Sequence, residues 1–144
     1  MSDDAIRERL LRHWQTAGID EDGSAEIYHD DAVLEFPQSG ERFVGRDTFT
    51  TWRKRYPAKL DFRVRRIAHD GNLWVCENLI SYDGGPWMLT VSILLFRDDR
   101  VEHERIYITD GWEAAPWRAE WAERFDPLEA LTTDDWRASA ATTG

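Results

Sequence analysis

Cysteine, basic residues and long apolar runs are scarce in this sequence, and each shortage excludes a class of protein. The single cysteine, Cys76, cannot form an internal disulfide, and no basic, apolar leader precedes the first amphipathic segment, so we expect a reducing, cytoplasmic location. The longest mostly apolar stretch, Leu89 to Phe96, is far shorter than the roughly 20 residues of a membrane-spanning helix, so we expect no membrane partner. Lys and Arg number 18 against 28 Asp and Glu, and the resulting net charge of −10 argues against a nucleic-acid partner.

Sharp catalytic and metal-binding motifs are also missing. The chain has no glycine loop that would cradle a phosphate, no GxSxG, no paired CxxC and no HExxH. Its four histidines do not pair at the spacing that metal sites use. We therefore expect neither a metal nor a cofactor.

Apolar and aromatic residues are plentiful, and in the first third of the chain they follow a helical period. The 144 residues are 42% hydrophobic and include eight tryptophans, which is enough for one folded domain with its own core. Helical spacing predicts a first helix from Asp4 to about Thr16 and a short second one with Ser24 as its N-cap. A third helix is predicted over 47–56, with three rings on one face, those of Phe49, Trp52 and Tyr56.

The following part of the chain has the period of strands. Charged residues alternate with Leu60, Phe62 and Val64, and turn signals at 70–72, 83–85 and 98–99 separate three further strands over 73–82, 87–96 and 101–109. A short strand, Ala32 to Phe36, precedes the third helix and is followed by a loop to Gly45. The predicted class is α+β, a curved antiparallel sheet with about three N-terminal helices on its concave side.

The C-terminal segment is set apart by its tryptophans. We assign residues 1–111 to one domain and residues 112–144 to an extension packed on it. Half of the tryptophans lie in this extension, at Trp112, Trp117, Trp121 and Trp136. Because Trp117, Trp121 and Phe125 recur at helical spacing, we expect a helical segment that docks its rings.

Two groups of charged residues allow more than one interpretation. Seven Lys and Arg residues between Arg53 and Arg66 are interpreted as a solvated basic face rather than an anion site. On the last strand, Glu102 and Glu104 share a side with Ile106 and Ile108, which is the pattern of a pocket with a polar mouth and an apolar floor. In such a pocket burial would raise the pKa of Glu104 and suit it to proton transfer. The residues equally allow Glu104 to pair with an arginine of a neighbouring strand.

Two segments carry a family resemblance. Residues 28–37, YHDDAVLEFP, followed by Gly45 and Arg46, resemble the first helix-strand junction of the nuclear transport factor 2-like superfamily. Residues 91–107 resemble its final hairpin in the SnoaL-like branch, and the resemblance extends over residues 5–110. It implies a cone in which three helices wrap against a bent sheet around an apolar cavity. Members include polyketide cyclases, ketosteroid isomerases, epoxide hydrolases and dehydratases, alongside modules without catalysis.

The acid/base residues of these enzymes are not matched in this chain. The aspartate that SnoaL-like cyclases and limonene-type epoxide hydrolases carry on the last strand corresponds to Ile106. The arginine and second aspartate of the hydrolases correspond to Asn78 and Ile80, and the isomerase base corresponds to Phe36. The resemblance therefore implies the cavity but not the chemistry of these relatives.

The resulting expectation is a pocket for a small hydrophobic molecule, polyketide-like or terpenoid-like. Candidate proton-transfer residues are Glu104 first and Asp110 second, for an isomerisation, cyclisation or dehydration that needs no cofactor. The alternative is a non-catalytic binding or dimerisation module, and the resemblance implies a homodimer, with the tail sealing the cone or a dimer interface. The predicted ligand-binding residues are Trp14, Leu34, Phe36, Trp52, Tyr56, Asn78, Ile80, Tyr82, Ile106 and Ile108.

Overall fold

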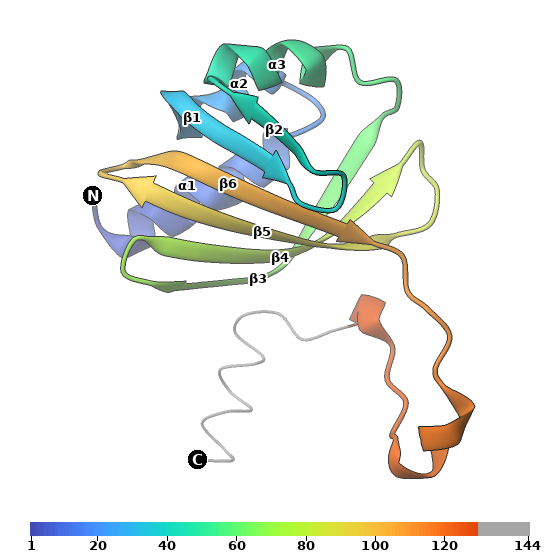
Figure 1. Ribbon diagram of the computed structural model, residues 1–144. Helices are drawn as coiled ribbons and strands as arrows, with labels where there is room; N and C mark the ends of the chain where they lie inside the picture. The colour runs from blue at the N-terminus through green and yellow to red at the C-terminus, as the bar shows by residue number, and fades with distance from the viewer. Residues whose placement is uncertain (130–144) are drawn as a thin grey trace.

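The computed structural model describes residues 1–129 and has the predicted α+β class, with helices grouped at the N-terminus and on one side of a bent sheet (Figure 1). The helices are α1 (Asp3–Thr16), α2 (Glu21–Ser24) and α3 (Arg46–Lys54), with 3₁₀ turns η1 (Ala25–Ile27), η2 (Pro116–Trp121) and η3 (Pro127–Glu129). The strands are β1 (Tyr28–Phe36), β2 (Glu41–Val44), β3 (Leu60–Asp70), β4 (Leu73–Tyr82), β5 (Met88–Arg97) and β6 (Arg100–Thr109).

The sheet has the order β2-β1-β6-β5-β4-β3. Strands β3 to β6 form the predicted antiparallel meander, but β1 pairs with β6 in parallel, so the sheet is mixed rather than antiparallel throughout. Turn residues reveal only the pairing of consecutive strands, and this pair joins segments about seventy residues apart. The first strand also begins earlier than predicted, at Tyr28, and the expected loop contains the short edge strand β2.

Helix α1 follows its sequence pattern closely. The Ser2 hydroxyl caps its N-terminus by accepting a hydrogen bond from the amide of Ala5, at 3.2 Å. Its buried face includes Leu10 and Trp14, which pack in the core cluster. Gly18 follows the helix at φ +82°, and a Cβ there would lie 2.7 Å from the carbonyl oxygen of Leu60, so the site requires glycine.

Helix α2 corrects the prediction for Ser24. Its N-cap is Asp20, whose Oδ1 accepts a hydrogen bond from the amide of Gly23 at 3.0 Å. Ser24 ends the helix, is buried and contacts His13. The strand β1 begins four residues later, at Tyr28. The short polar segment 20–24 offers two capping residues, and spacing alone does not choose between them.

A register shift in β6 decides what Glu104 faces. Simple alternation places Val101 and Glu104 on opposite sides of the strand. The pairing with β5 shifts between Leu95 and Phe96, so Val101 pairs with Phe96 while Glu104 pairs with Leu94. All four of these side chains are buried, which puts Val101 and Glu104 on the same, inner face. A β-bulge is the local feature that reverses the alternation here.

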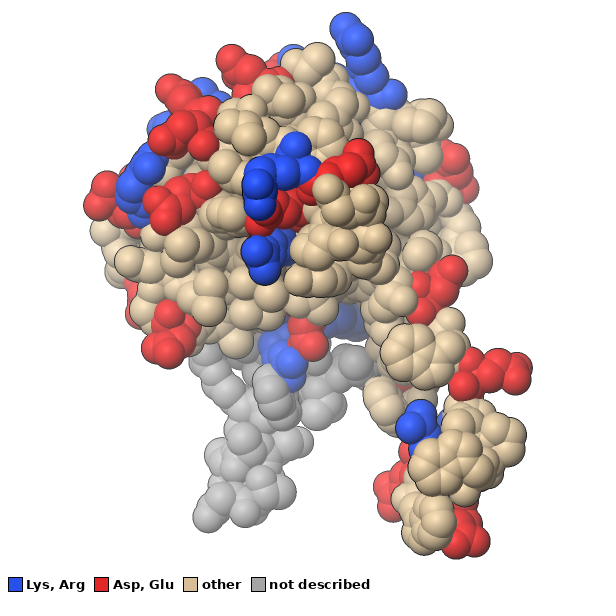
Figure 2. All heavy atoms as spheres, viewed as in Figure 1, with Lys and Arg blue, Asp and Glu red and all other residues tan. Residues whose placement is uncertain are grey.

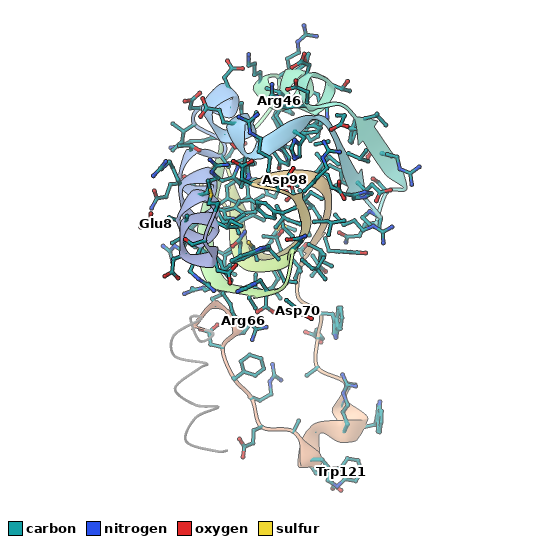
Figure 3. The ribbon with its side chains drawn as sticks, turned by 90° about the vertical axis from the view of Figure 1, so that its left-hand side faces the viewer. Glu8, Arg46, Arg66, Asp70, Asp98 and Trp121 are labelled. Atoms are coloured by element: carbon teal, nitrogen blue, oxygen red, sulfur yellow. The ribbon has the colours of Figure 1, made fainter. Side chains whose placement is uncertain are left out.

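The rings of the tail are not docked as predicted, although the carbonyl oxygen of Leu128 accepts a hydrogen bond from Arg65 of β3. Within the described part of the tail, Trp112, Trp117, Trp121 and Phe125 each expose 73–83% of their surface. Figures 2 and 3 show this segment standing off the domain, with Trp121 at its far turn. The turn that carries Trp117 and Trp121, η2, is a 3₁₀ helix, in which residues four apart do not share a face. Trp136 lies outside the described residues, and the boundary at residue 111 stays a prediction.

Candidate functional site

The helices and the concave face of the sheet enclose a cavity of about 660 Å³. Rings from both layers line it: Trp14 lies 5.2 Å from Phe62, Trp52 lies 5.1 Å from Phe43, and Tyr56 stacks on Tyr82 at 6.2 Å between centroids. The lining also includes the polar or charged residues His13, Glu21, Ser24, Gln38, Glu41, Arg53 and Thr90. The cavity is therefore an aromatic box with a few polar groups in its wall, the usual character of a small-molecule site.

Most of the predicted ligand-binding residues come together in this cavity. Eight of the ten predicted residues line it: Trp14, Phe36, Trp52, Tyr56, Ile80, Tyr82, Ile106 and Ile108. Three of these, Phe36, Ile80 and Ile106, occupy positions that the resemblance assigned to catalytic acids in relatives. The cavity wall is apolar where those enzymes would carry carboxylates.

Four predicted site residues lie elsewhere. Leu34 is fully buried in the core, and Asn78, 2% exposed, lies beneath the cavity wall with neither side-chain amide atom hydrogen-bonded within the described residues. Asp110 follows the end of β6 and is exposed to solvent. Glu104 is fully buried and does not line the cavity. Strand alternation predicts which side a residue faces, but it does not predict how deep that residue lies.

Glu104 belongs to a buried chain of polar groups. The hydroxyl of Tyr28 donates a hydrogen bond to Oε1 of Glu104 and accepts one from Nη1 of Arg53 at 3.3 Å. The predicted arginine partner thus comes from helix α3 and not from a neighbouring strand, and it acts through a tyrosine. Burial raises the pKa of Glu104, and this effect exceeds the opposing influence of Arg53, Tyr28 and Ser92. Burial also raises the pKa of Tyr28, so its hydroxyl stays neutral.

Arg53 is the first functional residue that the sequence analysis missed. It was assigned to a solvated basic face, but it lines the cavity, and its guanidinium carbon lies 5.3 Å, 5.7 Å and 5.8 Å from the ring centroids of Phe49, Tyr28 and Trp52. The available signal was its position four residues after Phe49, because residues at this spacing share a helix face.

His13 is the second missed residue. It is buried, it lines the cavity, and its Nδ1 lies 2.8 Å from the carbonyl oxygen of Ser24. Because a carbonyl oxygen only accepts, Nδ1 carries the proton and Nε2 is the basic nitrogen. Burial, helped by the nearby charge of Arg53, lowers the pKa of His13 to about 4, so the ring is neutral at pH 7. Its position three residues after Leu10 placed it on the inner face of α1.

Within residues 1–129, no cluster of three or more His, Cys, Asp or Glu side chains is arranged to hold a metal ion. No helix in this part of the chain is long and apolar enough to cross a membrane.

Comparison with known protein families identifies the family of this chain. The profile of the SnoaL-like domain matches residues 8–104. The chain belongs to the SnoaL-like domain family. Among solved structures, it is similar to an NTF-2 like protein of unknown function from Burkholderia xenovorans LB400, with 44% identity and a TM-score of 0.78, over 86% of this chain and 98% of that one. A search of curated proteins finds no match.

Two solved structures of lower identity show how widely the fold is shared. A candidate ketosteroid isomerase from Kribbella flavida DSM 17836 is 22% identical, with a TM-score of 0.78 over 89% of this chain and 96% of that one. A SnoaL-like polyketide cyclase candidate from Shewanella denitrificans OS-217 is 14% identical, with a TM-score of 0.63 over 73% of this chain and 90% of that one. At these identities the likeness shows the fold and leaves function to the site.

Proposed function

We propose that this SnoaL-like protein binds a small, flat hydrophobic molecule, polyketide-like or terpenoid-like, in the 660 Å³ cavity. The observation that carries the proposal is the aromatic box formed by rings from both layers of the fold, Trp14 and Trp52 from helices and Phe36 and Phe62 from strands. A cavity of this size and character can enclose most of the surface of such a molecule. A cytoplasmic location is part of the proposal, on the sequence grounds given above.

Filling the cavity should abolish binding. Ile108 lines the cavity from β6, and Ile108→Trp adds an indole to that space. We expect this variant to bind 9-anthracenemethanol, a flat neutral fluorophore, at least tenfold more weakly than the unaltered protein in a fluorescence titration. The matched control is Thr109→Trp, which adds the same ring at the next, exposed position and should bind normally. Equal affinity of the two variants, or no binding by the unaltered protein, would contradict the proposal.

An acid/base reaction is the second candidate function, and His13 is the residue that favours it. Neither Glu104 nor Asp110 lines the cavity, so neither contacts a molecule bound there directly. His13 does line it, and its Nε2 is unprotonated at neutral pH and has no hydrogen bond within the described residues. We infer that an isomerase, cyclase or dehydratase reaction at this site would use His13 as its base, with Glu104 positioning Tyr28 and Arg53.

The exposed tail supports a homodimer as part of the same proposal. Four large rings stand in solvent along 112–125, and each ring could bury about 150–250 Å² against a partner. Two such tails in a symmetric pair would reach the area of a standard interface, roughly 1,600 Å². The match to the Burkholderia xenovorans protein covers 86% of this chain. Residues 1–111 are a smaller share than that, so the match includes part of the tail.

Removing the tail should therefore dissociate the dimer without unfolding the domain. We expect the chain truncated after Gly111 to sediment as a monomer at concentrations where the full chain is a dimer, with a melting temperature changed by only a few degrees, because the described tail rings make no core contacts. The control is Ile19→Ser, which removes an equally exposed apolar side chain outside the tail and should remain dimeric. A monomeric full chain or a dimeric truncated chain would contradict this.

A further inference from the structure

The guanidinium of Arg53 occupies an unusual position for a cation. Three aromatic rings surround it within 6 Å, and within the described residues no carboxylate forms a salt bridge with it. Its only hydrogen bond there goes from Nη1 to the Tyr28 hydroxyl. Four of the five N–H groups of the side chain are therefore left for a partner. Arg53 is half-buried, and a guanidinium among rings is stabilised when an anion or several acceptors pair with it.

The neighbouring acidic groups do not supply that partner. Glu104 lies behind Tyr28, and burial raises its pKa, which favours the uncharged carboxyl. Glu21 lines the same cavity, but its Oε1 accepts the amide hydrogen of Gly18 at 2.5 Å. His13 is neutral at pH 7 and adds no second cation. Arg53 is thus the one Lys or Arg of the cavity wall among the described residues, and it shares that wall with the carboxylates of Glu21 and Glu41, neither of which forms a salt bridge with it.

We infer that the ligand of this cavity is a hydrophobic monocarboxylate, held with its carboxylate on Arg53 and its apolar body among the rings. This inference rests on the proposed function and names the ligand class for the same site. A planar carboxylate can accept two parallel hydrogen bonds from a guanidinium, and it carries the opposite charge. A neutral amide or alcohol lacks that charge. The two ring pairs of the cavity wall, Trp14 with Phe62 and Trp52 with Phe43, then cover the rest of the molecule.

Matched ligands test the inference. We expect 9-anthracenecarboxylate to bind at least tenfold more tightly than 9-anthracenecarboxamide at pH 7 and low salt, in a fluorescence titration. Arg53→Met keeps the length of the apolar stem and should bring the two affinities to within about twofold. Arg55→Met removes the same charge from an exposed position that does not line the cavity, and it should keep the preference. Glu21→Gln removes one of the two carboxylates that share the cavity wall with Arg53, the other being that of Glu41, and should strengthen carboxylate binding.

The outcomes separate this inference from the proposed function. Equal binding of carboxylate and amide by the unaltered protein would overturn the inference while leaving the hydrophobic pocket in place. A carboxylate preference that persists in Arg53→Met would overturn it as well. Binding of neither anthracene, nor of 9-anthracenemethanol, would overturn the proposed function and the inference together. If Arg53→Met fails to fold, the ligand pair and Glu21→Gln still decide the question on folded protein.

Discussion

Phe49→Ala is expected to lower the free energy of unfolding by about 3–5 kcal/mol, the range for deleting a fully buried phenylalanine. The ring of Phe49 packs edge-on against Tyr28, with centroids 4.8 Å apart, and lies 5.3 Å from the guanidinium carbon of Arg53. Its loss would leave a void beside the buried chain from Arg53 to Glu104. Since small domains are stable by only about 5–15 kcal/mol, this variant should lie near the edge of folding.

Urea unfolding at 25 °C measures this effect, and Leu95→Ala provides the control. Leu95 lies on β5, pairs with His103 on the outer side of the sheet and is 38% exposed, so its truncation should cost about 1 kcal/mol or less. A loss in Phe49→Ala no larger than that in Leu95→Ala would contradict the placement of Phe49 at the centre of the core. Reduced binding of 9-anthracenemethanol by the folded fraction of Phe49→Ala should accompany the loss of stability.

His13 should make the protein sensitive to mild acid. Its pKa is about 4 in the folded protein and about 6.5 when unfolded, so the unfolded chain binds the proton first as pH falls. The stability that His13 contributes is complete above pH 6.5 and is lost as pH falls through about 4. A difference of this size corresponds to about 3 kcal/mol between pH 7 and pH 4.

The variant His13→Asn isolates this contribution. Its amide can still donate a hydrogen bond to the carbonyl of Ser24, but it does not titrate. We expect the variant to be less stable at pH 7, because it loses ring contacts with Trp14 and Tyr28, and the difference to shrink as pH falls from 6.5 to 4. The other titratable groups are present in both proteins and cancel in the comparison. A difference that stays constant between pH 7 and pH 4 would contradict the burial of a neutral His13.

The sequence predicted which face of a helix or strand each site residue lies on, but it did not predict whether that residue lines the cavity or is buried behind it. Helical spacing placed Trp14 and Trp52 on inner faces, and alternation placed Ile106 and Ile108 on the inner side of β6, and all four line the cavity. Alternation also placed Glu104 on the inner side, and the family resemblance placed Asn78 in the pocket, yet both residues are buried and do not line the cavity. Periodicity predicts which face of a helix or strand a side chain lies on. The curvature of the sheet and the position of the helices decide which of these side chains line the cavity.

By itself, the sequence determined the α+β class, the four-strand meander and the SnoaL-like relationship. It also placed apolar residues at the positions where the resemblance assigns acids to enzymes of this fold. These properties follow from local periods, turn residues and residue identities, which are readable along the chain. The tertiary structure alone decided the parallel pairing of β1 with β6, the exposed tail, and the cluster of His13, Tyr28, Arg53 and Glu104. Those groups come from α1, β1, α3 and β6, and their partnership exists only because packing brings segments up to ninety residues apart around one cavity.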